Sequence, residues 1–154
     1  MMRHGNSCAC WMSHLEAAKL EPRDRAAIEA LITEFFELVD RGPTERLREL
    51  FVADGVVQAL DIGVDVRGSQ AIADFFVARV QGRHFTSRHS WTSLRVLEVG
   101  AHVVRTSTIV VTYIGQRPDA PSKDFSVGDC EDVFRRESDG QWRFVARNQV
   151  KIIS

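Results

Sequence analysis

The sequence predicts an α+β fold in which three N-terminal helices pack on the concave side of a strongly bent antiparallel β-sheet, forming a cone with a pocket. Two observations lead to this prediction. Segments with helical periodicity gather before residue 82, whereas alternating and β-branched segments fill the remainder. No internal repeat or low-complexity linker divides the chain. We therefore expect one domain over residues 22–154, preceded by a flexible tail over residues 1–21.

The first predicted helix covers residues 24–41. Its apolar side chains recur at the offsets of one helix face, and Gly42-Pro43 ends it because proline cannot continue a helix. That face consists of Ile28, Leu31, Ile32, Phe35, Phe36 and Val39. Asp40 then lies on the last turn, where a carboxylate opposes the negative end of the helix dipole at a cost of a few tenths to ~1 kcal/mol.

Short elements follow the first helix. A turn at Asp54-Gly55 is expected between a second helix and a short hairpin, and Ser69 begins a third helix with an apolar stripe. The expected ranges are 44–51 for the second helix, 56–60 and 64–67 for the hairpin strands, and 69–80 for the third helix.

Four long strands are predicted in the second half. The first of them carries a polar start with His89 and a more apolar end, and Ser138-Asp139-Gly140 reads as the last hairpin turn. Their ranges are 87–99, 103–114, 125–136 and 141–153.

The composition narrows the class of protein. The 154 residues are 44% apolar and 27% charged, with a formal net charge of −1, which gives no general attraction to nucleic acid or anionic lipid. No apolar run reaches the roughly 18 residues of a membrane span, and the N-terminus lacks the apolar core of a signal peptide. We expect a cytoplasmic protein without a cofactor.

The N-terminal stretch raises the question of a metal site. His4, Cys8, Cys10 and His14 fall within eleven residues, but Cys-x-Cys is not the usual spacing of structural zinc sites and no second ligand pair follows. The sequence favours a tail and no metal. With Cys130, the three cysteines do not form a disulfide framework.

Asp40 and His89 are the two residues for which the sequence itself suggests a role. Asp40 is placed against the helix dipole, and the imidazole of His89, at the polar start of a long strand, can accept and donate a proton near neutrality. Each residue also has a structural interpretation. Asp40 could form a solvated turn with Arg41 or Thr44, and His89 could be a hydrogen-bonded histidine at a pocket rim.

Five segments give the chain a family resemblance from Asp24 to about Val150. They are DRAAIEALITEFFELVDRG, LRELFVADGVV, RGSQAIADFF, SRHSWTSLRV and GDCEDVFRRESDGQWRFVAR. In order and spacing they resemble the SnoaL-like branch of the superfamily that contains ketosteroid isomerase, scytalone dehydratase and nuclear transport factor 2. The resemblance implies the cone-shaped α+β fold. It is less specific for function, since the scaffold also serves binding and assembly proteins.

The resemblance also implies site residues. Scytalone dehydratase and a related bile-acid dehydratase use an aspartate and a histidine at the positions of Asp40 and His89, and the latter enzyme has an arginine near Arg147. The resemblance therefore implies a catalytic pair, in which a carboxylate on one imidazole nitrogen fixes the tautomer that leaves the other nitrogen for substrate. Family residues that are lost include tyrosines at Phe35 and Ala59 and a histidine near Thr112. The base of ketosteroid isomerase also falls on Ala59, which argues against steroid isomerisation in that form. Arg147 or Trp91 could replace the missing donors to a substrate oxygen.

Two functions follow as expectations. The first is a cofactor-independent lyase or isomerase of dehydratase type that acts on an apolar, carbonyl-bearing small molecule. The second is a non-catalytic ligand-binding or oligomerising subunit, such as the small subunit of ring-hydroxylating dioxygenases. Both would assemble as a homodimer or higher homo-oligomer, because a bent sheet with one uncovered face leaves apolar surface to bury.

Overall fold

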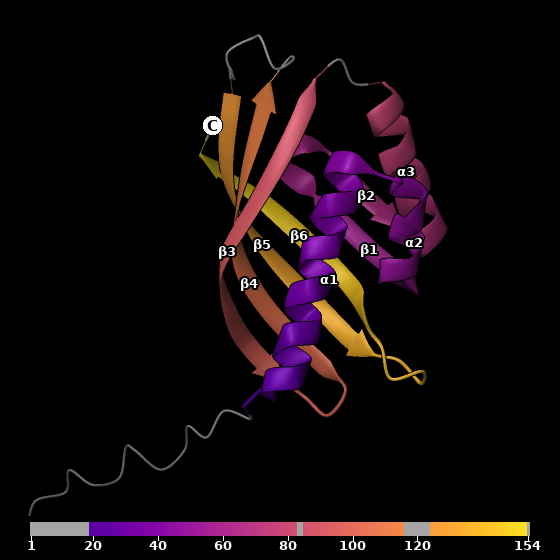
Figure 1. Cartoon of the computed structure of the whole chain (residues 1–154), viewed down its shortest axis with the longest axis vertical. Helices are drawn as coiled ribbons and strands as arrows, with labels where there is room; N and C mark the ends of the chain where they lie inside the picture. Colours follow the sequence, from indigo (N-terminus) through magenta and orange to yellow (C-terminus); the bar gives the residue numbers. More distant parts are fainter. Residues whose placement is uncertain (1–18, 83–84, 116–123, 154) are drawn as a thin grey trace, which may run out of the picture.

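Helices open the chain and four long strands close it in the computed structural model, which describes residues 19–82, 85–115 and 124–153 (Figure 1). The first half contains α1 (Pro22–Arg41), η1 (Thr44–Arg46), α2 (Leu47–Leu50), β1 (Phe51–Ala59), η2 (Leu60–Ile62), β2 (Val64–Arg67) and α3 (Ser69–Gln81). The second half contains β3 (Thr86–Val99), β4 (Val103–Gly115), β5 (Asp124–Arg136) and β6 (Trp142–Ile153). The predicted α+β class and the long strand around His89 are confirmed.

The six strands form one bent sheet in the order β2-β1-β6-β5-β4-β3. Neighbouring strands are antiparallel except β1 and β6, which run parallel with Val57 opposite Arg147. The prediction of a wholly antiparallel sheet is therefore wrong at this one pair. A parallel pair needs a long crossover rather than a tight turn, and here the chain between β1 and β6 contains β2, α3, β3, β4 and β5.

The predicted turn at Asp54-Gly55 is also wrong, because both residues lie inside β1. The pairing of β1 with β6 shifts register between Phe51 and Val56, which marks an irregularity of the bulge type. A Cβ on Gly55 would come within 3.0 Å of Phe51 and of the carbonyl oxygen of Val52. Gly55 therefore lies within a strand where another part of the chain comes too close for a side chain. Glycine is found both in turns and at such close contacts, and the local sequence does not distinguish the two.

The helices and the inner face of the sheet enclose the core. Alternate side chains of β4, from Val104 to Thr112, are buried and face inward, and α1 buries the stripe that includes Ile28, Ile32 and Phe35. In Figure 1, α1 crosses the sheet lengthwise, while α2 and α3 lie beside β1 and β2. This packing brings the C-terminal end of α1 against the beginning of β3.

Some predictions concern residues that the structure does not describe. His4, Cys8, Cys10 and His14 lie outside the described residues, as does most of the predicted tail, and the boundary at residue 22 stays a prediction. Among the described residues, no group of three or more His, Cys, Asp or Glu side chains is placed to hold a metal ion. No described helix is both long enough and apolar enough to cross a membrane.

Gly128 provides a test of how closely β5 and β6 approach. A Cβ there would lie 2.7 Å from the carbonyl oxygen of Val150, which belongs to the neighbouring backbone and cannot rotate away. We expect Gly128→Ala to lower the free energy of unfolding by about 1–3 kcal/mol in urea denaturation. Gly100→Ala, whose Cβ meets its nearest neighbour at 3.4 Å, should change it by less than about 0.5 kcal/mol. Equal effects would contradict this account of the β5–β6 contact.

Candidate functional site

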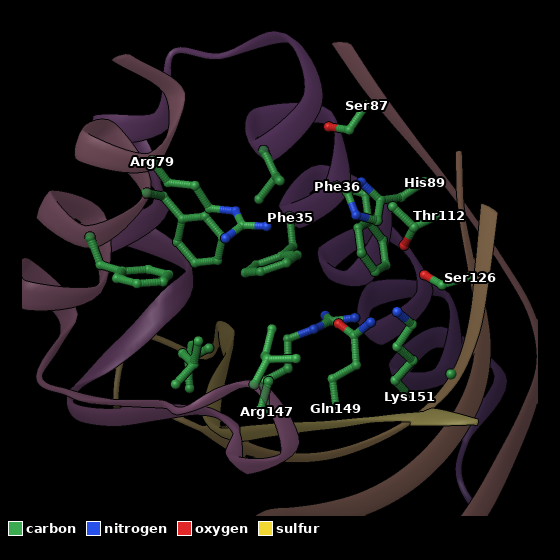
Figure 2. Close-up of a pocket in the computed structure, with 18 of the residues that line it drawn as sticks. Phe35, Phe36, Arg79, Ser87, His89, Thr112, Ser126, Arg147, Gln149 and Lys151 are labelled. Carbon is green, nitrogen blue, oxygen red and sulfur yellow. The ribbon is translucent and has the colours of Figure 1, made fainter. Parts of the chain in front are cut away.

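A cavity of about 250 Å³ lies between the helices and the inner face of the sheet. It falls just below the roughly 300–1,000 Å³ of typical small-molecule sites, so it suits a ligand of one or two rings. Its walls are mainly apolar and aromatic, with ten polar or charged residues among them (Figure 2). The polar and charged lining residues are Gln58, Asp61, Arg79, Ser87, His89, Thr112, Ser126, Arg147, Gln149 and Lys151.

Asp40 and His89 form the predicted pair. His89 Nδ1 lies 2.7 Å from Asp40 Oδ1, and the His89 backbone N–H donates to Asp40 Oδ2 at 2.7 Å. The Ser87 hydroxyl donates to Oδ1 at 2.9 Å. A carboxylate that accepts from Nδ1 selects the tautomer with the proton on that nitrogen, so Nε2 becomes the acceptor.

The environment of Asp40 keeps its carboxylate ionised. Burial raises its pKa, but the hydrogen bonds and charge of His89, together with the Ser87 hydroxyl, outweigh burial and leave the pKa below its ordinary value. Hydrogen bonds to a charged group contribute about 1.5–3 kcal/mol each, more than the ~0.3–1 kcal/mol by which the dipole of α1 opposes the charge. The carboxylate at this helix end is therefore held by β3 rather than by α1.

His89 presents its other ring nitrogen to the cavity. The imidazole lines the cavity and stacks on the Phe36 ring, with centroids 4.9 Å apart and planes 20° apart. None of the described residues forms a hydrogen bond to Nε2. The register of the sheet places Thr112 opposite His89 and Ser126 opposite Thr112, so the three side chains line one wall (Figure 2).

Arg147 brings a buried positive charge to the opposite wall. Its side chain is 2% exposed, and its guanidinium carbon lies 4.3 Å and 4.5 Å from the ring centroids of Phe35 and Phe36. Within the part of the chain that the structure describes, none of its three guanidinium nitrogens makes a hydrogen bond, and Asp132 Oδ2 is 3.7 Å from Nη1. Burial raises the pKa of Asp132, and the charge of Arg147 opposes that rise. Buried donors without a hydrogen-bond partner are uncommon in folded proteins and call for an explanation.

The structure brings together most of the residues that the sequence singled out. Phe35, Ala59, Thr112 and Arg147 line the cavity with His89, and Asp40 supports His89 from behind. The prediction for Trp91 as a donor to substrate is wrong. Its indole Nε1–H donates to the Thr33 hydroxyl of α1 at 3.3 Å, and it does not line the cavity.

Several residues that line the cavity were missed by the sequence analysis. Ser87 lies two residues before His89, and Gln149 and Lys151 lie two and four residues after Arg147. Side chains two apart on a strand share a face, so this spacing was a usable signal once one inward residue was known. Arg79 had no such signal, because its position depends on how α3 packs.

The lowered pKa of Asp40 predicts a specific acid response. As the pH falls from about 5 to 2, wild type should lose more unfolding free energy than Asp40→Asn. The unfolded chain takes up a proton on Asp40 near the ordinary pKa of about 3.9, whereas the folded chain, with its lowered pKa, does so only at lower pH. Above about pH 5 the Asp40 carboxylate is ionised in both the folded and the unfolded chain, so its contribution to the unfolding free energy is complete there. Asp139, whose pKa Arg143 and the Gln141 backbone lower to about 2, contributes equally to both and cancels. If the unfolding free energies of the two proteins, measured by urea denaturation, fell in parallel over this pH range, the assignment would be contradicted.

Comparisons with known proteins agree with this architecture. The chain resembles three structures from Novosphingobium aromaticivorans. One, provisionally named an aromatic ring hydroxylase, is 20% identical, with 88% of this chain and 94% of that one covered and a TM-score of 0.72. A second, provisionally named a scytalone dehydratase, is 19% identical, with 85% of each chain covered and a TM-score of 0.70, and an NTF2-like protein with a cystatin-like fold is 25% identical, with 84% of this chain and 82% of that one covered and a TM-score of 0.68. The comparison with curated proteins found no match. The sequence profile of the SnoaL-like domain matches residues 21–148, and the chain therefore belongs to the SnoaL-like domain family.

Proposed function

We propose that this protein is a cofactor-independent lyase or isomerase that moves a proton on an apolar, carbonyl-bearing small molecule. The observation that carries the proposal is the Asp40–His89 pair, joined at 2.7 Å, with the second imidazole nitrogen facing an apolar cavity. General acid–base catalysis by a positioned histidine requires this combination of a fixed tautomer and an accessible nitrogen. A structure provisionally named a scytalone dehydratase shares the fold and supports the same direction.

The proposed step balances without a redox partner. His89 Nε2 removes the proton α to the substrate carbonyl, and the electrons of that C–H bond form an enolate. The enolate collapses to a C=C bond, the C–O bond to a β-hydroxyl breaks, and the proton on Nε2 leaves with that hydroxyl as water. Return of the proton to another carbon instead would give isomerisation. Asp40 stabilises the imidazolium that exists between the two transfers.

Arg147 is the donor that we assign to the carbonyl oxygen. An enolate places negative charge on that oxygen, and donors fixed in a water-poor cavity stabilise such charge strongly. The guanidinium is already buried among the aromatic rings of Phe35 and Phe36, so its solvation has been lost before substrate arrives. It therefore needs little reorganisation when the charge develops.

The binding or assembly alternative predicts a filled cavity. A residual pocket would be packed by Phe35, Trp91 and their neighbours. Here Phe35 forms a wall rather than a plug, and Trp91 lies outside the lining against Thr33. The open cavity and the fixed His89 favour catalysis over a purely structural role.

The test follows a proton rather than a named substrate. β-Hydroxy ketones built on one or two six-membered rings would be incubated with the protein in D₂O, with NMR detection of α-deuteration and of water loss. We expect His89→Gln to lower the rate by about 10²–10⁴-fold, the contribution of a positioned acid–base group.

His102→Gln is the matched control, since His102 is an exposed residue between β3 and β4. It should leave the rate unchanged, and both variants should retain the wild-type circular dichroism spectrum. Deuteration and elimination that survive in His89→Gln would refute the role of His89. A wild-type protein that accelerates neither reaction with any member of the panel would favour the binding alternative.

We also propose that a second copy of the chain covers the outer face of the sheet. Tyr113 pairs with Phe125 across β4 and β5, and Ile109 and Val150 extend the same face, all of them more than a third exposed. The described helices lie on the opposite face of the sheet (Figure 1). Self-association around a two-fold axis would bury this apolar surface.

Sedimentation equilibrium measures the proposed assembly. Wild type should have twice the 17.4 kDa chain mass. Tyr113→Lys should shift the equilibrium toward monomer, because it places a charge within the buried surface. Leu60→Lys, which changes a 62% exposed apolar residue on η2, should not. A monomeric wild type at micromolar concentration would rule out this assembly.

A further inference from the structure

The charges around the cavity are unevenly distributed. Arg79, Arg147 and Lys151 line it, whereas Asp61 is the only carboxylate in the lining formed by the described residues. Asp61 is exposed and accepts the backbone N–H of Lys151 at 3.1 Å, which places it at the same end of the cavity as that lysine. The cavity is therefore net positive although the chain as a whole carries a formal charge of −1.

Arg79 and Lys151 also differ in their ion pairing from most basic side chains on the described surface. Residues such as Arg25, Arg41 and Arg143 pair with carboxylates at 2.7–2.8 Å. The side chains of Arg79 and Lys151 make no ion pair or hydrogen bond with any described residue. These two cations extend toward the cavity and have no partner within the described part of the chain.

Arg79 and Lys151 approach the cavity from different elements. Figure 2 shows Arg79 reaching from α3 toward the interior, while Arg147, Gln149 and Lys151 extend from β6 to the same side of the strand. Arg147 lies deep at 2% exposure, and Arg79 and Lys151 are exposed. One buried cation thus faces the interior, and two further cations with the Gln149 amide lie nearer solvent.

We propose that Arg79 and Lys151, with Gln149, form a subsite for a carboxylate group of the substrate. The substrate is then an acid with an apolar one- or two-ring body. Its carboxylate stays near the mouth, where a guanidinium can bind both oxygens and an ammonium adds a second charge. The field of these cations also draws the anion from solution before it binds. This inference rests on the proposed function in taking the cavity as the substrate site, but its test measures binding alone.

The probes are 2-naphthoate, 2-naphthamide and 2-naphthyl phosphate, which share one ring system and differ in charge. Isothermal titration calorimetry at low salt should give a dissociation constant about tenfold lower for naphthoate than for naphthamide, as two rim ion pairs allow. High salt should reduce this preference, because it screens exposed charges. Arg79→Gln combined with Lys151→Gln should abolish it.

Arg48→Gln is the matched control, since Arg48 is exposed on α2, bonds to Gln70 and lies outside the lining. It should keep the full preference for the acid. Equal binding of acid and amide, no binding of either, or a preference unchanged in the double variant would each overturn the subsite. Naphthyl phosphate binding more than about tenfold tighter than naphthoate would overturn its assignment to a carboxylate. Binding preference without any turnover would uphold the subsite and count against the proposed proton transfer.

Discussion

The contact between Asp40 and the beginning of β3 is the constraint on which the site depends. It joins residues 49 positions apart, and three donors from Ser87 and His89 converge on one carboxylate. Because the helix dipole disfavours a negative charge at this end of α1, the carboxylate gains its stability only when β3 is in place. The same contact fixes the imidazole tautomer, so docking of the helix and preparation of the histidine are a single event.

The aromatic rings of Phe35, Phe36, Phe76 and Phe144 pack together behind this contact, and those of Phe35 and Phe36 line part of the cavity and contact the guanidinium of Arg147. Phe35 meets Phe36, Phe76 and Phe144 edge to face at centroid distances between 5.4 Å and 5.8 Å, which braces one ring against three. Removing a guanidinium from water is expensive, and Asp132 at 3.7 Å compensates for it only in part. Contact with aromatic faces adds about 2 kcal/mol when the cation is desolvated. The rings therefore allow a charge to remain buried while its nitrogens stay available.

Sequence periodicity predicted α1 and the long strands, because their apolar spacing is local and strongly expressed. The Asp40–His89 pair was predicted through the family resemblance, since no local pattern links positions so far apart. The parallel β1–β6 pair and the position of Arg79 could not be predicted, because both depend on packing between distant segments. Trp91 shows that a side chain can share a strand face with a site residue and still lie outside the site. It shares a face with His89, but its indole bonds to Thr33 of α1 and does not line the cavity.

Separation of the charges inside the cavity is as important as their presence. Asp40 and Arg147 carry opposite charges, and a direct ion pair between them would neutralise both and leave His89 without its orienting partner. Phe36 packs against both groups, with its ring 4.9 Å from the imidazole and 4.5 Å from the guanidinium carbon. In the proposed reaction, proton removal next to the carbonyl creates a positive imidazolium and a negative oxygen, which a medium of low dielectric would penalise heavily. A carboxylate behind the imidazole and a guanidinium on the far wall match that pair of charges, and the Phe36 ring keeps the two from cancelling before substrate binds.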